Sequence, residues 1–293
     1  MHFNEYADDI HLFKPCSRTE RSIASPLEQA VAALRSDPNS EGFVEKYPLP
    51  TDTAERRRWL QAALTVRPPG NLPAELVASV NQILQSELAE KPVTEASELP
   101  RLPGSFIMAE SISIWEGDIT TLKIDAITNA ANTRLLGCFQ PFHQCIDNAI
   151  NCAAGPQLRE DCNRIMVLQG QDEQTGTAKI TRAYNLPSRF VLHTVGPIVS
   201  QGNPTQHQAR QLASCYVSCL SLAAKAGVRS VALCGISTGV FGYPVRQAAE
   251  IALDAVVNWL AANPKALDHV VFNTFGEHAT AVFLDAVHNR GNT

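Results

Sequence analysis

The sequence contains no uninterrupted apolar run of about twenty residues, the length that a membrane-spanning helix requires. Residues 1–15 are acidic and mixed in character, unlike a signal peptide. The sequence also lacks a basic excess: residues 1–100 hold 10 basic and 15 acidic side chains, residues 101–293 hold 14 of each, and the net charge is −5. A basic nucleic-acid-binding surface is not expected. We therefore expect neither a membrane nor a nucleic-acid partner.

Eight cysteines in 293 residues are too sparse for a disulfide-stabilised scaffold, and several lie within helix or strand patterns. This usage indicates a reducing, cytoplasmic compartment in which thiols are buried or bound to metal. With 45% hydrophobic residues, the chain is long enough for one large catalytic domain and an extension.

What the sequence does contain is a concentration of polar and metal-binding residues between positions 117 and 152. Cys138, His143 and Cys145 lie within eight residues of one another, where Gly137 and Pro141 are expected to shape a turn. Three such ligands with one open position are the arrangement of a catalytic zinc site, and no second Cys/His pair predicts a closed structural site. The spacing alone is equally compatible with two buried thiols and a hydrogen-bonded histidine.

The hydrophobic pattern changes at about residue 104. Before it, helical spacing predicts helices at residues 26–35, 53–66 and 74–90, within a small helical extension and linker (1–104). Ser25 and Asp52 are the expected N-caps of the first two helices. From 105 to 293, strands and helices alternate, which predicts an α/β domain with helices on both faces of a sheet. Residues 146–165 are predicted to form one helix in this domain.

Polar segments lie where several of the predicted strands end, which is where α/β sheets bind ligands. They are NAAN (129–132), GISTGVFG (235–242) and FNTFG (272–276). In the second, Gly239 and Gly242 should let backbone N–H groups turn inward before a helix, which suits a diphosphate. An ordinary strand-to-helix loop is the alternative, and the Gly-Lys-Ser/Thr ending of a Walker loop is absent.

Five segments together resemble the zinc-containing macrodomains, a branch of the macrodomain mono-ADP-ribosyl hydrolases. They are GDIT, DAITNAAN, GCFQPFHQCIDNAI, AAG and GISTGVFGYP, and the resemblance covers about residues 55–288. It implies a three-layer α/β/α macrodomain with a central mixed sheet, preceded by the small helical extension. One departure is Asn151, which stands where the resemblance leads us to expect a histidine.

The resemblance implies a zinc-dependent hydrolase that removes mono-ADP-ribose from modified protein side chains, through an ester linkage to Asp or Glu. One zinc ion per chain would be held by Cys138, His143 and Cys145, while Asn132 and Asp147 would position the distal ribose and the reacting water. The implied contacts of ADP-ribose are Asp118, Ile119, Asn129, Asn132, Ser237, Thr238, Gly239, Val240, Phe241 and Phe275.

Two other functions stay open: a non-catalytic ADP-ribose reader, which Asn151 favours, and a deacetylase of O-acetyl-ADP-ribose acting at the same site. The implied partners are a mono-ADP-ribosylated protein and a sirtuin-type ADP-ribosyltransferase in the same pathway, and we expect a monomer. Structural alternatives also stay open for single residues: Asp118 as a turn cap, Asn129 as a partner of loop backbone, Asp147 as a helix N-terminal carboxylate and Phe275 as a core residue. His193, in an apolar strand, is predicted to be a core histidine.

Overall fold

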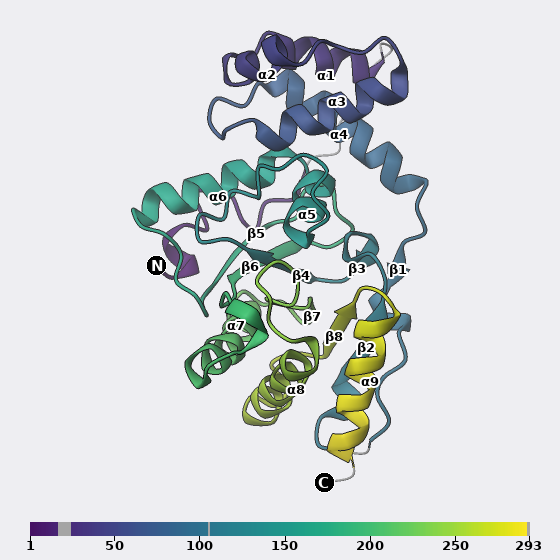
Figure 1. Ribbon diagram of the computed structural model, residues 1–293, viewed down its shortest axis with the longest axis vertical. Coiled ribbons are helices and arrows are strands. Elements are labelled where there is room, and N and C mark those ends of the chain that lie inside the picture. Colours follow the sequence, from purple (N-terminus) through teal and green to yellow (C-terminus); the bar gives the residue numbers. More distant parts are fainter. Residues whose placement is uncertain (17–24, 105, 292–293) are drawn as a thin grey trace. The chain divides into compact units, whose positions relative to one another are not determined.

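The computed structural model describes residues 1–16, 25–104 and 106–291, so residue 105 at the predicted domain boundary and residues 292–293 lie outside the described residues. The chain forms two compact units (Figure 1). The helical unit comprises Met1–Pro92, Arg134–Gln171 and Arg182–Leu186, and the sheet unit comprises Val93–Thr133, Asp172–Thr181 and Pro187–Thr293. The two units are defined by packing alone and do not test the predicted domain boundary between residues 104 and 105, which stays a prediction.

The predicted helices of the extension are confirmed. The helical unit contains α1 (Pro26–Arg35), α2 (Glu41–Lys46), α3 (Thr53–Val66), α4 (Ala74–Ala89), α5 (Ile146–Ala154) and α6 (Pro156–Gln169). Asp52 caps α3 as predicted, since its carboxylate accepts a hydrogen bond from Glu55 N at 3.0 Å. The predicted cap of α1 is wrong, because the Ser25 side chain makes no capping hydrogen bond. The short helix α2 was not predicted.

The single helix expected at residues 146–165 is wrong, because α5 and α6 are separated at Gly155. Gly155 has a φ of +95°, and the next residue, Pro156, has no N–H group to continue the ladder of α5. A Cβ at position 155 would stand 3.1 Å from Asn185 Nδ2 and 3.2 Å from Leu84 Cδ1. Glycine is therefore required both by the backbone conformation and by the close approach.

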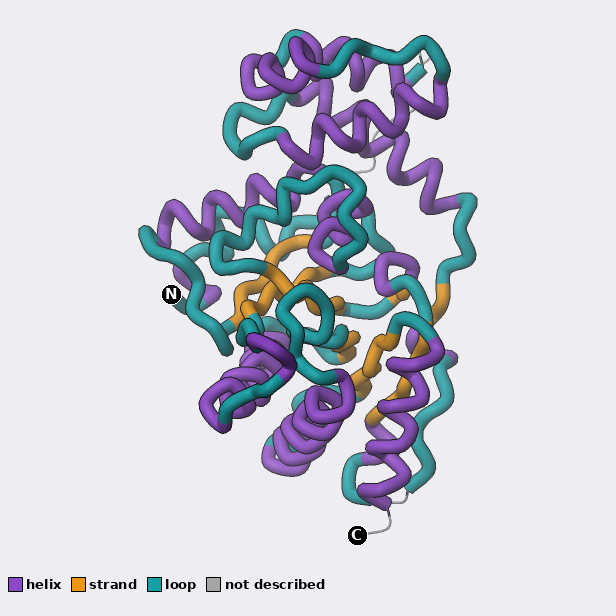
Figure 2. The backbone as a smooth tube through the Cα atoms, in the orientation of Figure 1, coloured by secondary structure: helices purple, strands orange, loops and turns teal. Residues whose placement is uncertain are grey.

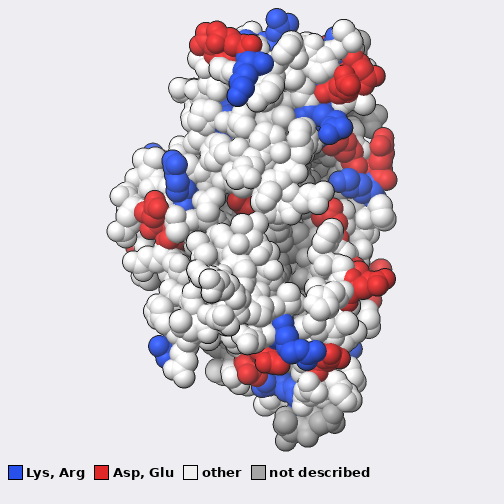
Figure 3. All heavy atoms as spheres, in the orientation of Figure 1, with Lys and Arg blue, Asp and Glu red and all other residues white. Residues whose placement is uncertain are grey.

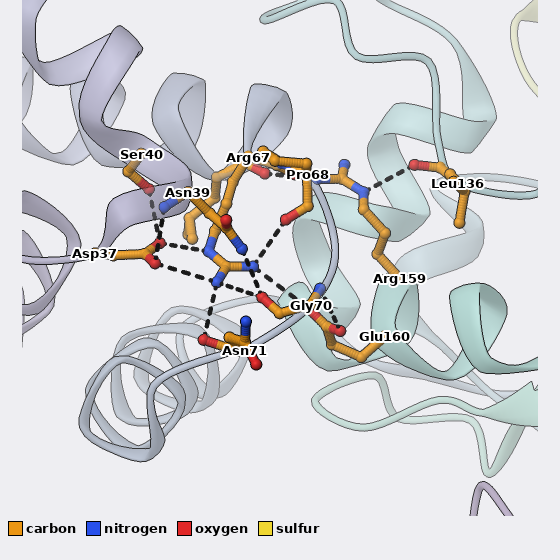
Figure 4. A network of polar contacts seen from close by, with 11 residues as sticks. Asp37, Asn39, Ser40, Arg67, Pro68, Gly70, Asn71, Leu136, Arg159 and Glu160 are labelled. Atoms are coloured by element: carbon orange, nitrogen blue, oxygen red, sulfur yellow. Dashed lines mark hydrogen bonds and ion pairs between the residues drawn. The ribbon is translucent and has the colours of Figure 1, made fainter. Parts of the chain in front are cut away.

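Helices α1, α3 and α4 share a hydrophobic core of their own. It consists of Ala30, Val31, Leu34, Trp59, Leu60, Ala63, Leu76, Val80 and Leu84. At the end of α3, Arg67 Nε donates to Asp37 Oδ2 at 2.6 Å, and both side chains are buried (Figure 4). This ion pair closes the connection between α1 and α2 onto the end of α3.

The sheet unit holds a six-stranded sheet with the order β2-β8-β7-β4-β6-β5. Its strands are β2 (Ile112–Glu116), β4 (Ala126–Ala131), β5 (Ala178–Arg182), β6 (Phe190–Val195), β7 (Ser230–Leu233) and β8 (His269–Thr274). The pairings β2–β8, β8–β7, β7–β4 and β4–β6 are parallel. The strands β4, β6, β7 and β8 are almost entirely buried, as runs of apolar residues predict for parallel strands.

Helices α7 (Gln206–Lys225), α8 (Val245–Ala262) and α9 (Glu277–Gly291) lie side by side against this sheet (Figure 2). A short pair, β1 (Thr94–Glu95) and β3 (Leu122–Lys123), forms a second sheet. The 3-10 helices are Phe3–Glu5, Pro38–Ser40, Ala96–Glu98, Ala109–Ser111, Ile119–Thr121 and Ser200–Gly202. Strands that alternate with helices along the chain are what the hydrophobic pattern predicted from residue 105 on.

Among the described residues, no helix has both the length and the apolar character needed to cross a membrane. On the face drawn in Figure 3, basic and acidic side chains are interspersed, and neither sign forms a continuous field. That distribution agrees with the near-balanced charge of the sequence.

The Arg67–Asp37 pair should make the stability of the helical unit depend on pH. Burial by itself raises the pKa of Asp37, but hydrogen bonds from Arg67 and Ser40, with the Arg67 charge, outweigh burial and hold that pKa below its ordinary value. A carboxyl with a lowered pKa stabilises the folded state above its unfolded pKa of about 3.9, and this stabilisation is lost as the pH falls through the folded pKa. We therefore expect the free energy of unfolding of Asp37→Ala to fall less steeply with decreasing pH than that of the wild type.

At pH 7 the same variant leaves a buried guanidinium without its main partner, which should lower the free energy of unfolding by about 3 kcal/mol in urea titrations. The control is Asp9→Ala, which removes a half-exposed pair with Arg164 and should cost less than about 1 kcal/mol. Equal losses in the two variants would contradict a special role for the buried pair.

Candidate functional site

Parallel pairing brings four strand ends to one edge of the sheet unit. Strand β2 ends just before Asp118, β8 just before Phe275 and β4 just before Asn132, while β7 runs into the loop of residues 235–244. Because the carboxyl ends of parallel strands meet at one edge, these segments share it. Within the sheet unit, the structure therefore gathers the segments that the sequence placed at strand ends.

The loop of residues 235–244 presents backbone N–H groups at this edge. Among the described residues, no hydrogen bond uses the N–H of Gly239, Val240 or Phe241 as its donor. The loop leads into α8, whose N-cap residue, Pro244, supplies no side-chain cap. Unpaired N–H groups beside the positive end of a helix form a natural site for a phosphate group.

Ser237 adds a hydroxyl to the same loop. It is buried, it has a φ of +64°, and its Oγ has no hydrogen-bond partner among the described residues. A Cβ at Gly196 would lie 2.1 Å from this Oγ, so only glycine fits beside it. The expected inward turn is partly as predicted: Gly242 has a φ of +69°, but Ser237 takes the other positive φ in place of Gly239. Thr238 Oγ1 donates to Gly235 O at 2.9 Å and tightens the turn.

Asp118 and its neighbours form a tight turn after β2. Asp118 Oδ1 accepts hydrogen bonds from Thr120 N at 2.9 Å and from Thr120 Oγ1 at 2.7 Å. Asp118 therefore acts as a cap of this turn. Its contact with adenine stays a prediction, as does that of the buried Ile119. Phe275 is 84% exposed, which places it outside the core and leaves its ring accessible for stacking.

The two asparagines of NAAN lie in different environments. Asn129 is fully buried in β4, where its Nδ2 lies 3.2 Å from Nδ1 of His193; a ligand contact by Asn129 stays a prediction. Burial lowers the pKa of His193 to about 3, so this histidine is neutral and is a core residue, as predicted. Asn132 follows the end of β4 and is half-buried.

In the helical unit, Cys138, His143 and Cys145 converge. Their ligand atoms all lie within 4.8 Å of one another, and each residue is half-buried. Nδ1 of His143 is buried and has no hydrogen-bond partner among the described residues. Zinc–sulfur bonds of about 2.3 Å in a tetrahedron place two sulfurs about 3.8 Å apart, so a small inward movement would bring the three atoms to zinc distance. These residues fit a metal ion.

Burial raises the pKa of the Cys145 thiol to about 11, with smaller contributions from Cys138 and Asp147. A metal ligand must be a thiolate, so binding would displace this proton. The Cys145 Sγ meanwhile accepts a hydrogen bond from Asn148 N at 3.4 Å and caps the start of α5. The thiol is thus fixed by the helix that follows it.

The loop that carries these ligands has an unusual backbone. Gly137 has a φ of +86°, as the predicted turn requires, but Leu135, Phe139 and Phe142 also have positive φ values of 59°, 52° and 62°. Bulky residues rarely adopt this region, and each costs of order 1–3 kcal/mol. These positive φ values could not be predicted from the sequence, because none of the three residues is Asn, Asp or Gly.

Asp147 and Asn151 form one unit on α5. Asn151 Nδ2 donates to Asp147 O at 2.9 Å and to Asp147 Oδ1 at 3.0 Å, and Asp147 is buried. The residue that departs from the expected histidine therefore holds the carboxylate in place. Cys152, on the same helix, lies against Thr65 and Gln61 of α3.

The strand-end edge and the α/β sheet define the class of this protein, and comparisons with known proteins agree. A profile of the Macro domain family matches residues 128–252. A protein-ADP-ribose hydrolase of Treponema medium is 46% identical over 250 residues, covering 85% of this chain and 93% of that protein. One of Staphylococcus aureus strain MRSA252 is 39% identical over 268 residues, covering 92% and 97%. The chain belongs to the macrodomain family.

A crystal structure of a Trypanosoma brucei macrodomain in complex with ADP-ribose is 31% identical, with a TM-score of 0.59, and covers 86% of this chain and 96% of that chain. The family match and the structural likeness confirm the predicted fold, an α/β macrodomain with a mixed central sheet and helices. The resemblance to macrodomains found in the sequence is also confirmed, whereas membership of the zinc-containing branch stays a prediction.

Proposed function

We propose that this protein is a zinc-dependent hydrolase that removes mono-ADP-ribose from modified protein side chains, with an ester to Asp or Glu as its substrate linkage. The observation that carries the proposal is the convergence of Cys138, His143 and Cys145 within 4.8 Å in a member of the macrodomain family. The names of the relatives, protein-ADP-ribose hydrolases, support the reaction, and the ADP-ribose complex of the Trypanosoma brucei macrodomain supports the ligand.

The sheet unit would bind the nucleotide part of ADP-ribose. The N–H groups of Gly239, Val240 and Phe241, with Ser237 Oγ, would donate to the diphosphate, which needs no positively charged side chain because the amides and the start of α8 supply positive potential. The exposed ring of Phe275 would stack on adenine.

The helical unit would hold zinc through the two cysteine thiolates and the imidazole. When bound, zinc would supply Lewis-acid polarisation and lower the pKa of a bound water. The carboxylate of Asp147, kept in orientation by Asn151 Nδ2, would accept a hydrogen bond from a ribose hydroxyl or from the reacting water. Asn132 would orient the distal ribose through its side-chain amide.

The metal cluster can be tested by Cys138→Ala. We expect release of ADP-ribose from a protein modified on an acidic residue to fall at least about a hundredfold, because Lewis-acid catalysis contributes several kcal/mol. ADP-ribose affinity, measured by calorimetry, should change less than about twofold. The matched control is Cys16→Ala, at an exposed cysteine outside the cluster, which should keep full activity. Full activity in Cys138→Ala would exclude the metal from the reaction. If the wild type binds ADP-ribose tightly but releases none from the modified protein, the alternative of a non-catalytic ADP-ribose reader would be favoured.

Binding of the diphosphate by the loop of residues 235–244 can be tested by Gly242→Ala. This glycine has a φ of +69°, and its added Cβ would stand 2.8 Å from Val199 O, so the loop must move. We expect the Kd of ADP-ribose to rise about tenfold or more while the zinc content is unchanged. Gly227→Ala is the control, since Gly227 has a similar φ of +73° but open space around it at the end of α7. Equal affinities in the two variants would show that the loop does not bind the ligand.

A further inference from the structure

Arg159 of α6 is a buried cation that takes part in no ion pair between described residues. Its guanidinium donates to three backbone carbonyls at 2.8 Å: Nε to Leu136 O, and Nη1 to Leu64 O and Arg67 O (Figure 4). Burying a charge is costly, and here three main-chain carbonyls compensate for it together with the Phe139 ring and the charge of Asp147. The guanidinium thereby joins two backbone segments: the loop at Leu136 and the end of α3 at Leu64 and Arg67.

One of these segments is the ligand loop, by which we mean residues 135–145 with the candidate metal ligands Cys138, His143 and Cys145. Arg159 contacts this loop on both sides of Cys138. Leu136 O accepts from Arg159 two residues before Cys138, and the guanidinium carbon lies 4.6 Å from the centre of the Phe139 ring just after it. Leu135 and Phe139, which flank this stretch, have positive φ values. A loop with this backbone needs support from outside itself, and Arg159 supplies it on both sides of the thiol.

The other segment is the end of α3, which is fixed in turn by the next residue of α6. Glu160 Oε1 and Oε2 accept from Gly70 N at 3.0 and 2.8 Å, and Glu160 Oε1 lies 3.3 Å from Arg67 Nη1 (Figure 4). Arg67 also donates to the buried carboxylate of Asp37. The chain of contacts therefore runs from the first helices of the protein, through Arg67 and Arg159, to Leu136.

We propose that Arg159 is a positioning residue of the metal site, and that the N-terminal helices serve as the support against which it holds Cys138. The inference rests on the proposed function insofar as it requires Cys138 to bind zinc. It assigns a role to the helical extension, whose sequence carries no chemical motif. Arg159 acts through the loop backbone and not by touching the substrate.

The test is the zinc affinity of Arg159→Lys, measured by competition of the purified protein against a chromophoric chelator. Lysine keeps the charge but lacks the planar fork that reaches three carbonyls. We expect zinc affinity to fall about 10–100-fold, the usual cost of losing a group that orients a metal ligand. Arg164→Lys is the matched control on the same helix, where the arginine forms only an exposed pair with Asp9, and its zinc affinity should equal that of the wild type.

A double-mutant cycle with Cys138→Ser distinguishes a role of Arg159 in positioning Cys138 from a general effect of Arg159 on stability. If Arg159 acts through Cys138, the loss of zinc affinity caused by Arg159→Lys should largely disappear in the Cys138→Ser background. The Co²⁺-substituted protein should also show weaker thiolate-to-cobalt absorption in Arg159→Lys. Should that variant fail to fold, Phe139→Leu removes the ring under the guanidinium and should lower zinc affinity about threefold.

Wild-type zinc affinity in a folded Arg159→Lys would overturn the inference and leave the proposed function standing. A loss of equal size in both backgrounds would also overturn it, because the effect would then be general stability. A wild-type protein that binds no zinc would overturn the metal part of the proposed function and this inference with it.

Discussion

The parallel pairing of β2, β8, β7 and β4 is the constraint on which the proposed nucleotide site of the sheet unit depends. Parallel strands end together, so segments far apart in sequence, near residues 118, 132, 240 and 275, reach one edge of the sheet. There the chain can offer main-chain N–H groups, a buried serine hydroxyl and an exposed phenyl ring without any cluster of basic residues. The proposed site would therefore need no excess of basic side chains, in agreement with the net charge of −5.

A second constraint acts on the ligand loop of the helical unit. Three metal-binding side chains within eight residues can converge only if the backbone turns sharply, and it does so through positive φ values at bulky residues. That backbone is unfavourable by itself and persists because Arg159, the end of α3 and the buried Arg67–Asp37 pair hold it. Residues 1–92 are thus part of the same packed unit as the three candidate metal ligands.

Much of this was predictable from sequence because the signals are local. Apolar periodicity predicted α1, α3 and α4, and Asp52 at the start of α3 is a strong N-cap signal. The strands were predictable as apolar runs that end in polar residues. The Cys138-x4-His143-x-Cys145 spacing indicated a cluster that the structure brings together.

What could not be predicted depends on contacts between distant residues. Arg159 carries no motif, and its role becomes visible only when Leu64, Arg67 and Leu136 surround it. The partner of Asn129 is a histidine 64 positions away. The break between α5 and α6 was signalled by Gly155-Pro156, but helical periodicity on both sides concealed it. Asn151 departed from the expected residue, and only the structure reveals its bond to Asp147.

The most direct test of the central claim is release of ADP-ribose from a protein esterified with it on an acidic side chain, followed before and after a strong zinc chelator. We expect release to stop in the chelated protein and to return on addition of one equivalent of Zn²⁺ per chain, while ADP-ribose binding persists throughout. Release that continues undiminished after complete removal of the metal would contradict this expectation.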